Sequence, residues 1–202
     1  MLRNEAAWLR SQLAARATGD LSPLLSIGSG TAASRARQPW IDQLVFEPLG
    51  ARGVEIRHHE HRPAPGVNVA GDLADRQFLD TIAELGARAI LCANVFEHVA
   101  DRDLLAGALA KALPPGGFLF VTVPRRYPHH PDPIDTMFRP TPAALAALFP
   151  SLAVVAADEV ECESLLRYAL AVRGKGAMVV NALRSLRAPR ADSPVADEAS
   201  CR

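Results

Sequence analysis

The sequence predicts an α/β fold in which a doubly wound, mostly parallel β-sheet carries helices on both faces. Between residues 24 and 149, apolar runs of strand length alternate with segments of helical periodicity, a pattern typical of parallel strands joined by helical crossovers. The run 89–93 is apolar throughout, as expected for a strand that is covered on both faces. Two final runs, 152–156 and 168–172, lie too close together for a helical crossover and should pair antiparallel as a hairpin.

Seven runs in all are predicted to be strands. They cover residues 23–27, 54–60, 67–70, 89–93, 118–123, 152–156 and 168–172. Glycine or proline bounds most of these runs, as the turns between strands require. Residues 44–47 could also pass for a strand, but the apolar residues between Ile41 and Leu49 recur at helical spacing. That segment is therefore predicted to be a helix.

The predicted helices begin and end at recognisable signals. Asp75 and Asp101 each precede a helical segment, where a carboxylate can accept hydrogen bonds from the free N–H groups of the first turn. Thr141 followed by Pro142 begins a third helix that extends to residue 149. Gly86 is placed to end the helix that Asp75 begins.

Length and composition indicate one main globular domain. The chain has 202 residues, of which 49% are hydrophobic, enough to bury a continuous core. We expect four parts: an N-terminal helix packed on the domain (1–20), the α/β domain (21–176), a C-terminal helix (177–190) and a polar, disordered tail (191–202).

The charge pattern argues against nucleic-acid and membrane partners. The 22 basic and 22 acidic residues cancel, so the chain lacks the positive field that such partners usually need. Its three cysteines have no Cys-x-x-Cys spacing, which argues against a disulfide framework. No apolar run has the length of a signal peptide core or a membrane span. We therefore expect a cytoplasmic protein whose partner is a small molecule; the oligomeric state stays open.

A glycine-rich turn follows the first predicted strand. Gly28-Ser29-Gly30-Thr31 leads from that strand into a helical segment of small residues. Glycine allows a tight turn and a close approach by a ligand, and the free N–H groups of the helix start attract polar or anionic groups. The turn is typical of a nucleotide-binding loop, although an ordinary strand-to-helix turn has the same composition.

Four motifs together resemble those of one enzyme family. They are Leu-Leu-Ser-Ile-Gly-Ser-Gly (24–30), Gly-Asp-Leu (71–73), Asn-Val-Phe-Glu-His-Val (94–99) and the Pro-Pro-Gly-Gly segment with its apolar strand (113–124). In order and spacing they are similar to those of class I S-adenosylmethionine-dependent methyltransferases, over residues 24–172. The resemblance implies the strand order 3-2-1-4-5-7-6, with strand 7 antiparallel. The loop 127–140 resembles that of a bacterial subgroup of this family.

The resemblance implies S-adenosyl-L-methionine as the cofactor and S-adenosyl-L-homocysteine as its product. The cofactor-binding residues would be Ser26, Gly28, Ser29, Gly30, Glu60, Asp72, Leu73, Asn94, Val95 and His98. Within this set, Glu60 would accept the two ribose hydroxyls, with Glu47 as its rival, and Asp72 would bind the adenine amino group. Ser26 stands where the family usually has an acid, and Ala32 replaces a third glycine.

The loop after the fifth predicted strand carries the candidate catalytic residues. His130 or His129 is the natural general base because histidine titrates near neutral pH. Asp132 and Asp135 could orient that histidine or an acceptor hydroxyl. Asp135 could instead form an ion pair with Arg139 that holds the loop. The expected reaction is methyl transfer to a hydroxyl of a small molecule that is anionic or sugar-like.

No metal is assigned from the sequence. The loop 129–135 and the run 58–61 both contain ligand-type residues, but neither has a helix to fix their spacing. Two other functions stay open. A domain that binds the cofactor without turnover would fit the departures at Ser26 and Ala32, and an NAD-type dehydrogenase would fit the turn alone.

Overall fold

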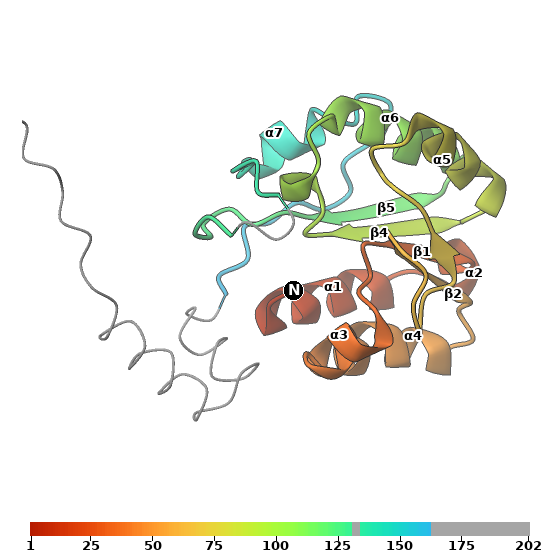
Figure 1. Cartoon of the computed structure of the whole chain (residues 1–202). Helices are drawn as coiled ribbons and strands as arrows, with labels where there is room; N and C mark the ends of the chain where they lie inside the picture. Colours follow the sequence, from red (N-terminus) through yellow and green to blue (C-terminus); the bar gives the residue numbers. More distant parts are fainter. Residues whose placement is uncertain (131–133, 163–202) are drawn as a thin grey trace, which may run out of the picture. The chain divides into compact units, whose positions relative to one another are not determined.

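The computed structural model describes residues 1–130 and 134–162. Its centre is one parallel sheet of five strands in the order β3-β2-β1-β4-β5 (Figure 1). The strands are β1 (Leu24–Ile27), β2 (Ile56–Glu60), β3 (Val69–Ala70), β4 (Ala89–Ala93) and β5 (Phe118–Thr122). All four neighbouring pairs run parallel. The predicted parallel α/β architecture is confirmed for these strands and this order.

Helices cover both faces of the sheet. They are α1 (Arg3–Ala14), α2 (Thr18–Leu21), α3 (Ala32–Ala36), the π-helix η1 (Asp42–Phe46), α4 (Glu47–Ala51), α5 (Arg76–Thr81), the 3-10 helices η2 (Ile82–Leu85) and η3 (Phe96–His98), α6 (Arg102–Ala112) and α7 (Pro142–Ala146). Figure 1 shows α5 and α6 on one face and α1, α3 and α4 on the other. Residues 42–51 are helical, as their periodicity predicts. Among the described residues, no helix is both long and apolar enough to cross a membrane.

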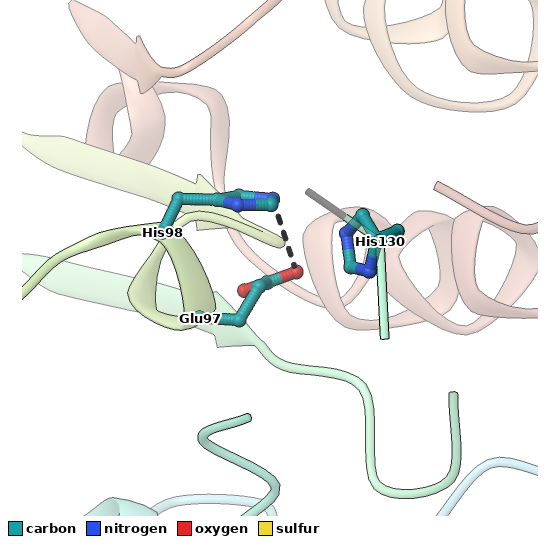
Figure 2. Close-up of side chains that lie close together, drawn as sticks. All are labelled: Glu97, His98 and His130. Atoms are coloured by element: carbon teal, nitrogen blue, oxygen red, sulfur yellow. Dashed lines mark ion pairs between the residues drawn. The ribbon is translucent and has the colours of Figure 1, made fainter. Parts of the chain in front are cut away.

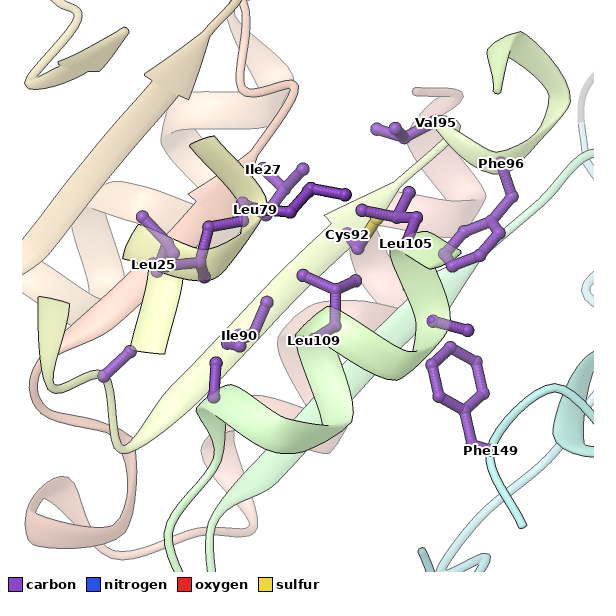
Figure 3. Packing of buried hydrophobic residues seen from close by; sticks show 14 residues of the cluster. Leu25, Ile27, Leu79, Ile90, Cys92, Val95, Phe96, Leu105, Leu109 and Phe149 are labelled. Carbon is purple, nitrogen blue, oxygen red and sulfur yellow. The ribbon is translucent and has the colours of Figure 1, made fainter. Parts of the chain in front are cut away.

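A hydrophobic core joins the two central strands to α5 and α6 (Figure 3). Alternate residues of β1 and β4 pack against the apolar faces of these helices: Leu25, Ile27, Ile90 and Cys92 from the strands, and Leu79, Leu105 and Leu109 from the helices. Each large buried side chain stabilises the fold by about 1.5–3 kcal/mol relative to exposure. The core therefore holds β1 beside β4, with Ile27 in register with Cys92.

The predicted helix caps are present. Asp75 accepts a hydrogen bond from the Gln77 N–H at 2.9 Å, and Asp101 accepts one from Leu104 at 3.0 Å. Thr141 accepts one from Ala144 at 3.2 Å. These caps set where α5, α6 and α7 begin, and so determine how the loops before them leave the carboxyl edge of the sheet.

Residues 152–156 differ from the prediction, because they form no strand. Val154 and Val155 are 62% and 64% exposed. A strand needs a hydrogen-bonded neighbour, and the neighbour predicted for this one, 168–172, lies outside the described residues. The predicted C-terminal helix (177–190), the tail (191–202) and Asp132 also lie outside them. The sixth strand is therefore absent at 152–156, and the antiparallel seventh strand stays a prediction.

Candidate functional site

The glycine-rich loop after β1 lies against the loop after β4. Gly28 and Gly30 have φ angles of 61° and 77°, in the left-handed region that favours glycine. A Cβ atom on Gly28 would lie 2.6 Å from Val95 Cγ2, so a side chain there would collide with Val95. Thr31 then caps α3 through a 3.2 Å hydrogen bond from the Ser34 N–H. The first loop therefore depends on glycine for both its conformation and its contact with Val95.

The carboxyl end of β2 supplies hydrogen-bond partners to the same loop. The Gly30 N–H donates to Glu60 Oε1 at 2.6 Å, and the Ser29 N–H donates to the His59 carbonyl at 3.0 Å. Ser29 Oγ lies 2.6 Å from His58 Nδ1. Of the two acids considered for the ribose role, the structure thus brings Glu60 to the glycine loop, whereas Glu47 begins α4.

Two histidines of β2 have lowered pKa values. Burial, together with the nearby Arg35 cation, lowers the pKa of His58 to about 4. Burial also lowers the pKa of His59, whose ring stacks on Phe78 with 5.1 Å between centroids. His59 Nε2 lies 3.1 Å from the Gly71 carbonyl oxygen. The sequence pattern places His59 only within the ligand-type run 58–61 and gives it no role at the glycine loop.

Asp72, Leu73 and Ser26 occupy different environments. Asp72 is exposed just after β3, and its Oδ1 accepts a hydrogen bond from the Ala74 N–H at 2.9 Å. Leu73 is half-buried against the core. Ser26 is only 2% exposed within β1. Asp72 therefore offers an accessible carboxylate beyond the sheet, whereas the Ser26 side chain is enclosed by it.

The end of β4 is connected to the N-terminal helix. Asn94 has a φ angle of 54°, and its Nδ2 donates to Glu5 Oε1 at 2.7 Å. The same oxygen of Glu5 accepts a hydrogen bond from Thr122 Oγ1 at 2.5 Å. Glu5 thus joins α1 to the carboxyl ends of β4 and β5. Sequence reasoning missed both Glu5 and Thr122, because no local pattern links residues so far apart.

Glu97, His98 and His130 come together at this edge; we call them the Glu97 cluster (Figure 2). Glu97 is 1% exposed, and its Oε1 lies 3.9 Å from His98 Nε2. Burial raises the pKa of Glu97 to about 7. The rings of His98 and His130 meet edge to face, with centroids 5.0 Å apart. The structure therefore joins a predicted cofactor-binding residue to a predicted catalytic one.

Asp135 and Arg139 support His130 from behind. Asp135 Oδ2 lies 3.0 Å from His130 Nδ1 and accepts a hydrogen bond from Arg139 at 2.7 Å. This hydrogen bond from Arg139 holds the pKa of Asp135 well below its usual range. The predicted Asp135–Arg139 ion pair and the predicted orientation of a histidine by Asp135 are thus both present. His129, the other candidate base, is exposed.

The loop that carries His130 is fastened to η3. Thr136 donates two hydrogen bonds to the Glu97 carbonyl, one from its N–H and one from its hydroxyl, both at 2.9 Å. His98 Nδ1 also contacts the Ile134 carbonyl oxygen. These bonds explain how residues more than 30 positions apart in the sequence meet.

Comparison with known proteins yields no match: no family model fits the chain, and no curated protein or solved structure is significantly similar to it. The observations that bear on function are therefore the residues at the carboxyl edge of the sheet. These comprise a glycine loop with acids beside it and, next to that loop, a buried carboxylate with two histidines. The first arrangement suits a nucleoside-type ligand, and the second suits proton transfer or metal binding.

Proposed function

We propose that the chain is an S-adenosylmethionine-dependent methyltransferase that acts on a hydroxyl of a small molecule. The observation that carries the proposal is the contact between the glycine loop after β1 and Val95 after β4. In open α/β sheets, ligands bind beyond the carboxyl ends of the strands where the connections change direction, here between β1 and β4. The first and third motifs of the resemblance meet at this point.

The residues present fit a nucleoside-type cofactor. Gly28 has no Cβ to obstruct a ligand or Val95, and Glu60 stands beside the loop with two carboxylate oxygens for ribose hydroxyls. The exposed carboxylate of Asp72 can accept a hydrogen bond from an adenine amino group. When bound, S-adenosylmethionine supplies an electrophilic methyl group. The protein's own part is then to bind, to align and, for a hydroxyl acceptor, to remove a proton.

His130 is the residue best placed to remove that proton. Its Nδ1 lies against the Asp135 carboxylate, so the Nδ1–H tautomer is favoured and Nε2 carries the lone pair. Arg139 keeps Asp135 ionised, so a carboxylate stays at His130 Nδ1 and orients the ring. His130, oriented by Asp135, is therefore the candidate general base, whereas His129 is exposed to solvent.

Calorimetric titration with S-adenosylhomocysteine tests the proposal. Glu60→Gln and Asp72→Ala should each weaken binding by about tenfold or more, since a hydrogen bond to a charged group contributes roughly 1.5–3 kcal/mol. The matched control is Glu55→Gln, because Glu55 is an exposed acid just before the opposite end of β2. Equal binding by all three variants and the parent chain would contradict the site. Binding of reduced nicotinamide dinucleotide instead would favour a dehydrogenase.

A domain that binds the cofactor without turnover is the second candidate. The observation that favours it is Ser26, a buried hydroxyl at a position where the resembled family usually has an acid. Such a domain would bind S-adenosylhomocysteine in the same titration. It would transfer no methyl group to any hydroxyl acceptor, and His130→Ala would change none of its measurable properties with the cofactor.

A further inference from the structure

The Glu97 cluster brings three metal-ligand types to one point. Glu97 and His98 belong to η3 after β4, and His130 belongs to the loop after β5. One ligand atom from each residue lies within 4.8 Å of the other two. In Figure 2 the Glu97 carboxylate points toward both rings, and a ring nitrogen of His130 faces the other two side chains. Three donors therefore face a common space.

Both histidines are held in the form that a metal ligand needs. The Nδ1 atom of His98 contacts the Ile134 carbonyl oxygen, and that of His130 lies 3.0 Å from Asp135 Oδ2. An oxygen acceptor at Nδ1 keeps the proton on that nitrogen and leaves the Nε2 lone pair for a metal. Such outer partners are the usual support of metal-binding histidines. Asp135 is itself held in place by an ion pair with Arg139, which fixes the position of the carboxylate that orients His130.

The Glu97 carboxylate has a buried oxygen atom without a hydrogen-bond partner among the described residues. The Glu97 residue is 1% exposed, and its Oε2 has no hydrogen-bond partner among the described residues. Buried polar atoms are normally paired, and an isolated buried carboxylate is strongly unfavourable. This observation is independent of the geometry of the two histidines. A cation between the three side chains would supply the missing partner.

We propose that Glu97, His98 and His130 bind a divalent transition-metal cation of the zinc type. Two imidazole nitrogens and one carboxylate oxygen form a donor set that zinc uses where it keeps a fourth position open. The binding site itself does not depend on the proposed methyl transfer. A role in catalysis does rest on that function: the cation would lower the pKa of an acceptor hydroxyl bound at the open position, the proton would pass to bulk water, and His130 would act as a ligand instead of as the base.

The test is a calorimetric titration of the full chain with zinc chloride after treatment with a chelator. We expect one equivalent to bind, with cobalt giving visible absorption bands of a four-coordinate site. His130→Ala and Glu97→Gln should each weaken zinc binding by tenfold or more. His129→Ala, an exposed neighbour of His130, and His61→Ala, in the histidine-rich run of β2, should leave it unchanged.

The proposal is overturned if zinc fails to bind the parent chain, or if His130→Ala and Glu97→Gln bind it as the parent does. Loss of binding in His61→Ala alone would place the ion on the β2 run and would also overturn it. Circular dichroism checks that each variant folds. If Glu97→Gln does not fold, the zinc affinity of His130→Ala decides the test, because His130 is only half-buried and its loss should disturb the fold less. S-adenosylhomocysteine titrated into the Glu97→Gln and His130→Ala samples keeps the two proposals separate, because neither residue is among those proposed to hold the cofactor.

Discussion

The glycine loop and the Glu97 cluster lie at the same edge of the sheet but are built differently. In the glycine loop, the Gly30 N–H is paired with Glu60 and the Ser29 N–H with the His59 carbonyl. In the Glu97 cluster, the Glu97 carboxylate has an oxygen without a partner among the described residues. The backbone N–H groups of the loop are thus held by a carbonyl and a carboxylate of the neighbouring strand, whereas the cluster is assembled from side chains of separate segments.

The difference suggests separate roles: the glycine loop provides a shape that a ligand can fit, and the Glu97 cluster provides chemically reactive side chains. The glycine loop is constrained, because two of its N–H groups are paired with β2 and Gly28 leaves no room for a Cβ beside Val95. What the loop offers a ligand is therefore close approach to its backbone and the neighbouring Glu60 carboxylate. The Glu97 cluster keeps a buried carboxylate of raised pKa beside two imidazoles. Groups of that kind are characteristic of sites that move protons or bind cations.

The largest expected effect tests the rigidity of the glycine loop. Gly28→Ala should lower the free energy of unfolding by about 3 kcal/mol, combining the cost of a left-handed alanine with the collision with Val95. Gly86→Ala is the matched control, since Gly86 has nearly the same φ but open space around its Cβ position. It should cost roughly 1 kcal/mol. Equal costs in urea unfolding would mean that the contact with Val95 contributes nothing.

An intermediate effect tests the support of the Glu97 cluster. Asp135→Asn keeps the shape of the side chain but removes the charge that faces His130 and Arg139. Loss of such an outer partner typically weakens metal binding about 10-fold to 100-fold, so zinc titration should show a decrease of that size. Asp80→Asn, an exposed acid on α5, is the control. An unchanged zinc affinity would show that His130 is held without Asp135.

The smallest expected effect is on the pH dependence of the unfolding free energy, through His58 beside the glycine loop. Because the pKa of His58 is lowered to about 4, the unfolded chain binds a proton between pH 6.5 and pH 4 that the folded chain does not. The His58 contribution to stability should therefore fall as the pH decreases through this window, whereas Glu97, with its raised pKa, contributes in the opposite direction. In urea unfolding, His58→Asn should reduce the slope of the unfolding free energy against pH. The reduction should correspond to less than one bound proton. The lowered pKa of His59 gives the same kind of pH dependence in the parent chain and in the His58→Asn variant, so it does not affect the comparison. Parallel profiles would contradict the assignment.

Much of the glycine loop could be predicted because its causes are local. The turn after β1, the caps at Asp75 and Asp101 and the helix at 42–51 follow from residues within one or two turns of one another. The pairing of Glu60 with this loop depends on β2 lying beside β1, which no local pattern shows. The helical spacing of residues 41–49 made Glu60 the better choice over Glu47.

The Glu97 cluster illustrates what sequence reasoning could not reach. In the sequence, the histidines of residues 58–61 and of residues 129–135 form separate groups, and no local pattern joins His98 to His130. Nor does any local pattern join Glu5 to Asn94 and Thr122, 89 and 117 positions away. The predicted strand at 152–156 is absent for a related reason, since a strand exists only through its neighbour.

By itself, the sequence determined the parallel α/β architecture, the glycine loop and the helix caps, because hydrophobic periodicity and backbone conformation act over a few residues. Only the tertiary structure decided which loops meet at the carboxyl edge of the sheet. Packing of the core sets β4 between β1 and β5, and that placement brings Glu97 and His98 to a loop more than 30 residues further along the chain. Contacts of this range depend on the whole fold, and no local pattern encodes them.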